Sequence, residues 1–362
     1  MAERRPNPVM RIAFLLAMGA LSLSAVEMAM RYRNWPPAVI SGWRVSEVGG
    51  PVNQLGWRGH PWQPHRPGDF IVVLTGRAEC AACPPDETLD LVLERALRQY
   101  NPDARVVTLS SRGYSQDQEL LALHEYFAHD RADLVVTWAS IADDVPGNMF
   151  RTVQTGSGEP RLKPTFAFQN DDIRGPTEGI GQPVYRLKLT TWLRPLFIDL
   201  DRNWSRTLPA AEPGSAAAPP GIETREPVDG GLREQRTPWA IWLTPRPARV
   251  KYGIDLTHAL LLHMRELAIL HGARFMVLLT PPDTHAQGPV ALKHGGRWFV
   301  ADPAMRDAAV VEVTDGLDTI TLPRDDSQPN AVAGEQNIMA RLAGVLSQHN
   351  LLVSAALTRP RH

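Results

Sequence analysis

The pattern of apolar and polar positions along this chain predicts strands and helices that follow one another in alternation. Continuous apolar runs, which are typical of buried parallel strands, occur at 69–74, 105–109, 134–138 and 274–279. Apolar residues at helical spacing occur at 88–100, 118–127, 255–271 and 336–348. A further short apolar run, at 309–313, is interpreted as a strand. The alternation predicts an α/β fold in which helices cover both faces of a parallel sheet.

The N-terminus differs from the rest, because residues 12–30 form a long apolar run that only Glu27 interrupts. Nineteen helical residues span about 28 Å, which is close to the thickness of the hydrocarbon core of a membrane. The run is preceded by Arg4, Arg5 and Arg11, which favour a cytoplasmic N-terminus. Residues 12–30 are therefore predicted to lie in the lipid bilayer as a single-pass anchor.

A cleaved signal peptide is the alternative interpretation, because Ala20-Leu21-Ser22 resembles a small-x-small cleavage site. Both interpretations place the rest of the chain outside the cytoplasm. Glu27 lies near the predicted membrane exit, where it can pair with Arg31 one helical turn later or contact a neighbouring helix. Tyr32 and Trp35 follow as predicted interfacial anchors.

Shifts in composition divide the chain into three regions. Residues 1–33 contain the cytoplasmic tip and the anchor, 34–68 form an extended Pro/Trp-rich segment, and 69–355 form the α/β domain. Within that domain, residues 207–236 are rich in Pro, Ala, Gly and Glu, a composition that buries little surface. They are predicted to form a flexible insertion.

Charge and motif content exclude several functional classes. The 362 residues carry a formal net charge of −1, so no strong positive field is present to attract nucleic acid. No Walker loop occurs, and no G-x-G-x-x-G follows a predicted strand, so no nucleotide cofactor is expected. The two cysteines lack paired Cys or His partners at zinc-site spacing, so no metal is expected either.

Five segments, in order along the chain, are similar to those of the SGNH (GDSL-like) superfamily of hydrolases and acyltransferases. They are Asn53–Gly59, Thr75–Arg77, Arg112–Gln118, Ala142–Pro146 and Asp325–Asn330. The first looks like the N-x-x-G-[FYW]-R-[GD] segment of membrane-anchored members from cell-envelope polysaccharide systems. The resemblance implies a flavodoxin-like three-layer α/β/α domain with a parallel sheet. It also implies O-acyl transfer or ester hydrolysis on an envelope polysaccharide as the reaction of the family.

The positions that carry the chemistry in this family hold other residues here. Arg77 stands at the position of the nucleophilic serine, and Gln328 stands at that of the histidine base. Neither side chain can perform the missing step, since arginine stays protonated and glutamine is no base near neutral pH. Asp143 replaces the asparagine that donates to the oxyanion, and Asp326 has no imidazole to orient. Gly113 fits the oxyanion glycine, although any tight turn after a strand also favours glycine.

Two consequences follow from this alignment. If Arg77 lies beside Asp143, the two side chains would form an ion pair in the former catalytic pocket. Rescue of catalysis by another serine, such as Ser110, Ser111 or Ser140, would need a base close by.

The only cysteines form the motif Cys80-Ala81-Ala82-Cys83, just after the first predicted strand. A strand, a C-x-x-C motif and a helix in this order also occur in thioredoxin-like proteins, so thiol–disulfide chemistry is one interpretation. A structural disulfide in an oxidising compartment is the other.

The sequence as a whole predicts a pseudoenzyme, not a working enzyme. We expect a single-pass protein of a bacterial inner membrane, with its N-terminus in the cytoplasm and its α/β domain in the periplasm. Its partners would be integral membrane proteins, for which it would act as a structural or binding subunit. By analogy, candidate hosts are polysaccharide machinery and photosynthetic reaction-centre or light-harvesting complexes. An O-acyltransferase or esterase and a thiol–disulfide protein remain the alternatives.

Overall fold

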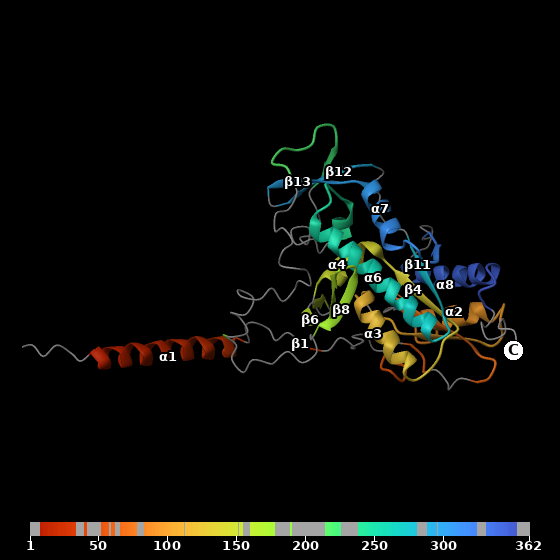
Figure 1. Cartoon of the computed structure of the whole chain (residues 1–362), viewed down its shortest axis with the longest axis horizontal. Coiled ribbons are helices and arrows are strands. Elements are labelled where there is room, and N and C mark those ends of the chain that lie inside the picture. The colour runs from red at the N-terminus through yellow and green to blue at the C-terminus, as the bar shows by residue number, and fades with distance from the viewer. Residues whose placement is uncertain are drawn as a thin grey trace, which may run out of the picture.

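The computed structural model describes most of the chain. The described residues are 8–33, 40–41, 52–57, 59–61, 66–77, 83–111, 113–150, 152–154, 160–177, 189, 214–225, 238–280, 288–294, 296–323 and 331–352. They form an α/β body preceded by a separate N-terminal helix, α1 (Pro8–Tyr32), as Figure 1 shows. Of the residues proposed from the sequence, Trp35, Cys80, Asp326 and Gln328 lie outside the described ranges.

A five-stranded sheet with the order β14-β11-β4-β2-β3 lies at the centre of the body, and all its neighbouring strands pair in parallel. Its strands are β2 (Phe70–Gly76), β3 (Ala104–Thr108), β4 (Leu134–Ala139), β11 (Arg274–Leu279) and β14 (Thr319–Thr321). The first four correspond to the predicted strands, whereas β14 was not predicted. The edge at which β2, β3 and β4 end is called the carboxyl edge below.

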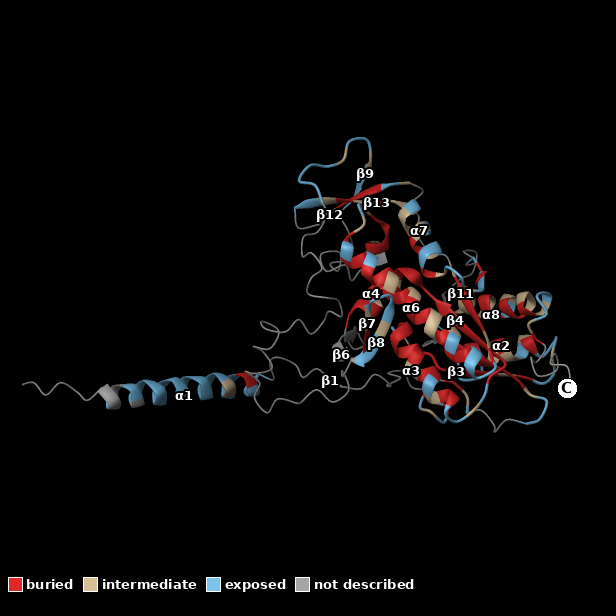
Figure 2. Cartoon of the chain, in the orientation of Figure 1, coloured by how far each residue is buried: buried red, intermediate tan, exposed pale blue. Residues whose placement is uncertain are grey.

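Helices cover both faces of this sheet. They are α2 (Leu89–Leu97), α3 (Gln116–Phe127), α4 (Ile141–Met149), α6 (Ala248–Leu270), α7 (Pro303–Val313) and α8 (Ala331–Gln348), with a short 3-10 helix η2 (Pro238–Trp242). Because successive strand side chains point to opposite faces, β2 contributes to two separate cores. Val72 packs with α2 and α8, while Val73 packs with α3, α4 and α6. The sheet is therefore buried on both sides (Figure 2).

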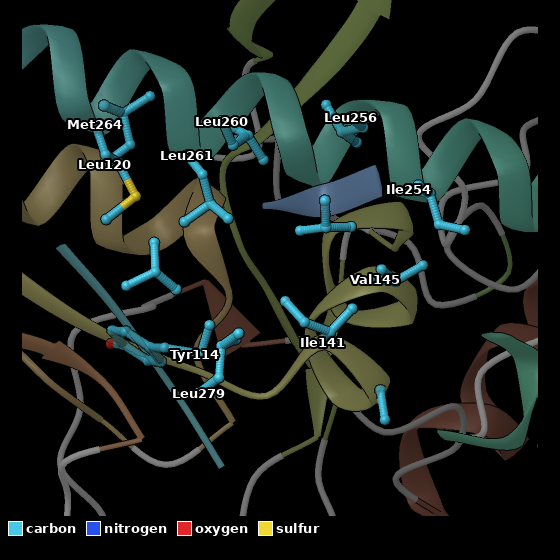
Figure 3. Close-up of a cluster of buried hydrophobic side chains, with 14 of the residues drawn as sticks. Tyr114, Leu120, Ile141, Val145, Ile254, Leu256, Leu260, Leu261, Met264 and Leu279 are labelled. Carbon is cyan, nitrogen blue, oxygen red and sulfur yellow. The ribbon is translucent and has the colours of Figure 1, made fainter. Parts of the chain in front are cut away.

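The larger core lies between the sheet and the long helix α6. Leu256, Leu260 and Met264 project from α6 toward residues of α3 and α4, as Figure 3 shows. These side chains are fully buried, and truncating one such leucine to alanine typically costs 2–5 kcal/mol. This packing fixes the starts of α3 and α4, which lie at the carboxyl edge.

One predicted strand is wrong, because residues 309–313 belong to α7. The run of β-branched residues suggested a strand, but the helix has a strong start signal. The Asp302 side chain accepts a hydrogen bond from the backbone N–H of Ala304, and Pro303 occupies the first helical position. Ala309 and Val313, four residues apart, are buried, whereas Val311 is exposed, as a helix requires.

Several smaller sheets are present that the sequence did not predict. Their strands are β1 (Ile40–Ser41), β5 (Thr152–Gln154), β6 (Pro160–Leu162), β7 (Thr165–Gln169), β8 (Asp172–Thr177), β9 (Glu223–Arg225), β10 (Leu243–Thr244), β12 (Val290–His294) and β13 (Arg297–Ala301). They form a β1-β6-β5 sheet, a β7-β8 hairpin and a β10-β13-β12-β9 sheet. Residues 214–225, which belong to the predicted insertion, are attached here, since β9 pairs with β12 and Ser215 bridges to Trp298.

The N-terminal helix is long, apolar and largely exposed. Among the described residues, one helix, over Phe14–Tyr32, is long and apolar enough to cross a membrane. Its large apolar side chains are exposed, including Leu15 and Leu16. The expected ion pair is present, with Arg31 Nε 2.7 Å from Glu27 Oε1.

Candidate functional site

The carboxyl edge begins where β2 ends, at Gly76 and Arg77. Gly76 has a φ of +87°, and a Cβ at this position would lie 2.2 Å from the backbone oxygen of Trp138 on β4. Only glycine tolerates both conditions, so the chain can turn sharply out of the sheet here. The backbone N–H of Arg77 donates to the same Trp138 oxygen, at 3.0 Å. This N–H is therefore already bonded and does not point toward a substrate oxyanion.

The side chain of Arg77 meets Asp143 at this edge, as the alignment predicted. Arg77 Nη2 lies 3.0 Å from Asp143 Oδ2, and the two side chains are 51% and 43% exposed. Asp143 belongs to the first turn of α4, and its Oδ2 also accepts a hydrogen bond from Ser140 Oγ at 2.7 Å. We call Arg77–Asp143 the outer pair. The hydroxyl of Ser140 is thus held by a carboxylate that is itself paired with a guanidinium, and no imidazole of a described histidine is bonded to it.

Two further segments of the resemblance lie at the same edge. Gly113, between β3 and α3, has a φ of +78°, so the turn requires glycine whether or not its N–H binds anything. The side chain of Asn53 lies at the end of β3, where its Nδ2 donates to the backbone oxygen of Thr108 at 2.8 Å. Gly59 packs on the same residue, since a Cβ there would lie 2.2 Å from Thr108 Cγ2. The segment around Asn53 is therefore built into the carboxyl edge.

Below the outer pair lies a buried polar network that the sequence did not predict. Lys163, just after β6, donates from Nζ to Asp117 Oδ2 on α3, and both side chains are only 1% exposed. We call Lys163–Asp117 the inner pair. Asp117 Oδ1 also accepts from the backbone N–H of Gln118 at 2.8 Å. Burial raises the pKa of Asp117, and Lys163 opposes this shift.

The network continues from the inner pair to the residues beside the outer pair. Asn148 donates to Gln116 at 2.7 Å, and Gln116 donates to Asp144 Oδ2 at 2.7 Å. Asp144 Oδ2 also accepts from the backbone N–H of Ser140 at 2.8 Å. Burial raises the pKa of Asp144 to about 7, with a smaller contribution from the neighbouring Asp143.

A third buried carboxyl, Glu119, lies beneath the end of β2. Its Oε2 accepts from Thr75 Oγ1 at 3.2 Å, and Thr75 in turn contacts Thr137 Oγ1 at 2.9 Å. Among the described residues, Glu119 Oε1 has no hydrogen-bond partner. Desolvation raises the pKa of Glu119 well above its usual value, and the charge of Asp144 raises it further. A neutral, protonated Glu119 is the form that this environment favours.

One hydroxyl–imidazole contact is present near the carboxyl edge, at the start of α2. Thr88 Oγ1 lies 3.2 Å from His60 Nδ1, and Asp90 Oδ2 lies 3.5 Å from the same ring nitrogen. In a catalytic triad the hydroxyl and the carboxylate contact opposite nitrogens of the ring, which this arrangement does not allow. Asp90 Oδ2 also accepts from the backbone N–H of His60 at 2.9 Å, so these residues act as a clamp. No serine–histidine hydrogen bond is present among the described residues.

The remaining sequence predictions concern the cysteines and metal binding. Cys83 is disulfide-bonded and buried in the core beside α2 and α8, where Gln336 Nε2 lies 3.9 Å from its sulfur. Within the described ranges, no group of three His, Cys, Asp or Glu side chains is arranged to hold a metal ion.

No protein-family model matches the chain. A search of the curated proteins finds no match either. The resemblance to the SGNH superfamily therefore stays a prediction that rests on the sequence segments.

Proposed function

We propose that this protein is a membrane-tethered, non-catalytic domain of the SGNH type. It serves as a structural or binding subunit of a complex in a bacterial inner membrane, with its α/β body in the periplasm. The apolar helix α1 supports the tether. Polysaccharide machinery and photosynthetic complexes stay the candidate hosts, by analogy with the family and with membrane assemblies in general.

The order of the central strands supports the proposed SGNH-type fold. Numbered along the chain, the order is 2-1-3-4-5, which is the order of flavodoxin-like doubly wound sheets. In such sheets ligands bind beyond the carboxyl ends of the two strands from which the chain winds in opposite directions. Here these strands are β2 and β4. Arg77 follows β2 directly, and Asp143 lies in the first turn of α4, four residues after the end of β4. The outer pair thus occupies the place where this kind of sheet binds its ligand.

The outer pair is the observation that carries the non-catalytic proposal. An acyl transfer needs a nucleophile and a base at this place, whereas a guanidinium and a carboxylate are the groups that are present. About half of each side chain stays exposed, so both remain accessible to a partner. Charged groups at a partially exposed edge suit recognition of a polar or charged protein surface.

Co-purification tests this proposal. The full-length protein, extracted from its native membrane in mild detergent, is expected to bring integral membrane proteins with it. The double variant Arg77→Ala/Asp143→Ala should lose most of these partners and keep its thermal stability, because an exposed pair contributes only about 0–1 kcal/mol.

A matched control is available on the exposed side of α6. Lys251 Nζ lies 3.1 Å from Asp255 Oδ1, and this pair is also solvent-accessible. Lys251→Ala/Asp255→Ala should keep the partners. Reproducible isolation of the wild-type protein as a lone monomer would contradict the proposal.

Thiol–disulfide exchange is the second candidate, since Cys83 is disulfide-bonded just before α2. Its buried sulfur disfavours attack by an outside thiol. The candidate predicts reductase activity that Cys80→Ser abolishes, and activity that survives this change would reject it. The O-acyltransferase or esterase alternative predicts covalent labelling by a serine-reactive probe.

A further inference from the structure

The connection between the anchor and the body is short. α1 ends at Tyr32, Arg33 is the last described residue after it, and β1 begins at Ile40. Seven Cα steps span at most about 25 Å, even when fully extended. A compact domain of about 300 residues has a radius of gyration of roughly 19 Å and is therefore roughly 50 Å across. The tether is about half as long as the body is wide, so the body cannot turn freely above the membrane.

Strand β1 ties the end of this tether to the interior of the body. It pairs in parallel with β6, with Ile40 opposite Arg161 and Ser41 opposite Leu162. One residue after β6, Lys163 enters the core and binds Asp117 of α3. Removing one partner of an ion pair that is buried to this extent strongly destabilises the fold, so the inner pair holds β6 in place. The tether is therefore attached to a part of the body that is held in place by buried contacts.

The C-terminal end of α1, where the helix is proposed to leave the membrane, makes a second contact with the rest of the chain. Glu27 Oε2 accepts a hydrogen bond from the backbone N–H of Leu189 at 2.8 Å. The Glu27 side chain is 12% exposed and Met30 is 7% exposed, although the rest of the helix is largely exposed (Figure 2). The last turns of α1 are thus less exposed than the rest, and one of them is bonded to a residue 162 positions away.

The β1-β6-β5 sheet lies beside the carboxyl edge, because Lys163, one residue after β6, binds Asp117 in the first turn of α3. Asn53, which is bonded to Thr108 at the end of β3, follows Arg33 by twenty residues, and β1 lies between them. Figure 1 shows β1 and β6 on the side of the body that is nearest to α1. The amino ends of the central strands lie at the opposite edge, about 20 Å away along strands of up to seven residues.

From these attachments we propose that the body is held in one orientation on the membrane. The β1-β6-β5 sheet and the carboxyl edge face the phospholipid headgroups of the leaflet from which α1 emerges, and the amino edge faces away. This proposal rests on the membrane tether of the proposed function. It deepens that function, because it places the outer pair on the membrane side, where parts of integral membrane partners protrude.

Fluorescence quenching from the headgroup plane tests the orientation. Val52→Cys places a label beside Asn53, and Leu270→Cys places one at the end of α6, near the amino edge; both positions are exposed. The full-length protein is labelled without reductant, so that Cys83 stays in its disulfide, and the wild type measures background labelling. The protein is then placed in phosphatidylcholine nanodiscs that contain headgroup spin-labelled lipid.

The expected result is quenching several-fold stronger at position 52 than at position 270. A flexible insert of roughly 20 Gly/Ser residues between Arg33 and Ile40 raises the fully extended length of the tether to roughly 95 Å, well beyond the width of the body. Combined with Glu27→Ala, which removes the bond to Leu189, it should make the quenching at the two positions nearly equal. Equal quenching in the protein without the insert, or stronger quenching at position 270, would overturn the orientation. Either result would leave the proposed complex intact, because co-purification tests the complex independently of how the body sits on lipid.

Discussion

Two ion pairs at the carboxyl edge, linked by the buried hydrogen-bond network, differ in almost everything except their chemistry. The outer pair, Arg77–Asp143, is about half exposed, whereas the inner pair, Lys163–Asp117, is almost completely buried. Water screens the outer pair, so it adds little to stability and its side chains are free to meet a partner. The inner pair has lost its hydration, so each charge depends on the other. The exposed outer pair, which we propose to be a recognition site, thus differs from the buried inner pair, which supports the fold.

The largest expected effect comes from breaking the inner pair. Lys163→Met leaves Asp117 buried without its counter-charge, and the free energy of unfolding should fall by about 3–5 kcal/mol. Urea denaturation measures this loss. In the double variant Lys163→Met/Asp117→Leu no unpaired charge remains, and much of the stability should return. A loss below about 1 kcal/mol in the single variant would mean that the two pairs do not differ as described.

The second-largest expected effect is the pH dependence of the free energy of unfolding, which tests the buried network around Asp144. The folded pKa of Asp144, about 7, lies above its unfolded value, so the folded state binds more protons between these values. The stability that this group contributes is present at low pH and is lost as pH rises through about 7. The free energy of unfolding should fall by about 2 kcal/mol from pH 5 to pH 7 on this account. The raised pKa of Glu119 acts in the same direction.

Adjacent variants isolate this effect. Asp144→Asn removes the titrating group and should flatten the pH dependence of stability. Asp143→Asn, one residue away, removes the outer pair and only the smaller contribution of the Asp143 charge to the pKa of Asp144, so it should leave most of the dependence in place. If both variants behave alike, the buried network is not the source of the pH dependence.

The smallest effect is expected from the outer pair. A double-mutant cycle with Arg77→Ala and Asp143→Ala should give a coupling energy below about 1 kcal/mol, and it should decrease as salt is added. Chemical denaturation of the four proteins gives the value. A coupling of several kcal/mol would show that the outer pair is a structural element and not a free recognition surface.

The sequence predicted the large, periodic elements well and the small ones poorly. The four long central strands and the helices that follow them carry continuous apolar runs or helical spacing, and these were found. Strands of two or three residues, such as β1 and β14, are too short to show a period. The helix α7 was missed because its β-branched residues outweighed the cap formed by Asp302 and Pro303.

The outer pair and the buried network also differ in whether the sequence predicted them. The outer pair was predicted because the alignment placed Arg77 and Asp143 just after two strands of one sheet, whose ends meet at one edge. The buried network was missed because Gln116–Glu119, four polar residues in a row, normally indicate a solvent-exposed helix start. Here the segment around Lys163 and the helices α4 and α6 cover them. Such tertiary contacts leave no local signal in the sequence.

The central claim is that the carboxyl edge binds and does not react, and a fluorophosphonate probe tests it most directly. The full-length protein in mild detergent is treated with the probe beside a heat-denatured sample, and any adduct is mapped by mass spectrometry. The account predicts no labelling above that of the denatured sample. A specific adduct on a serine or threonine at the carboxyl edge, such as Ser140 or Thr88, would contradict it.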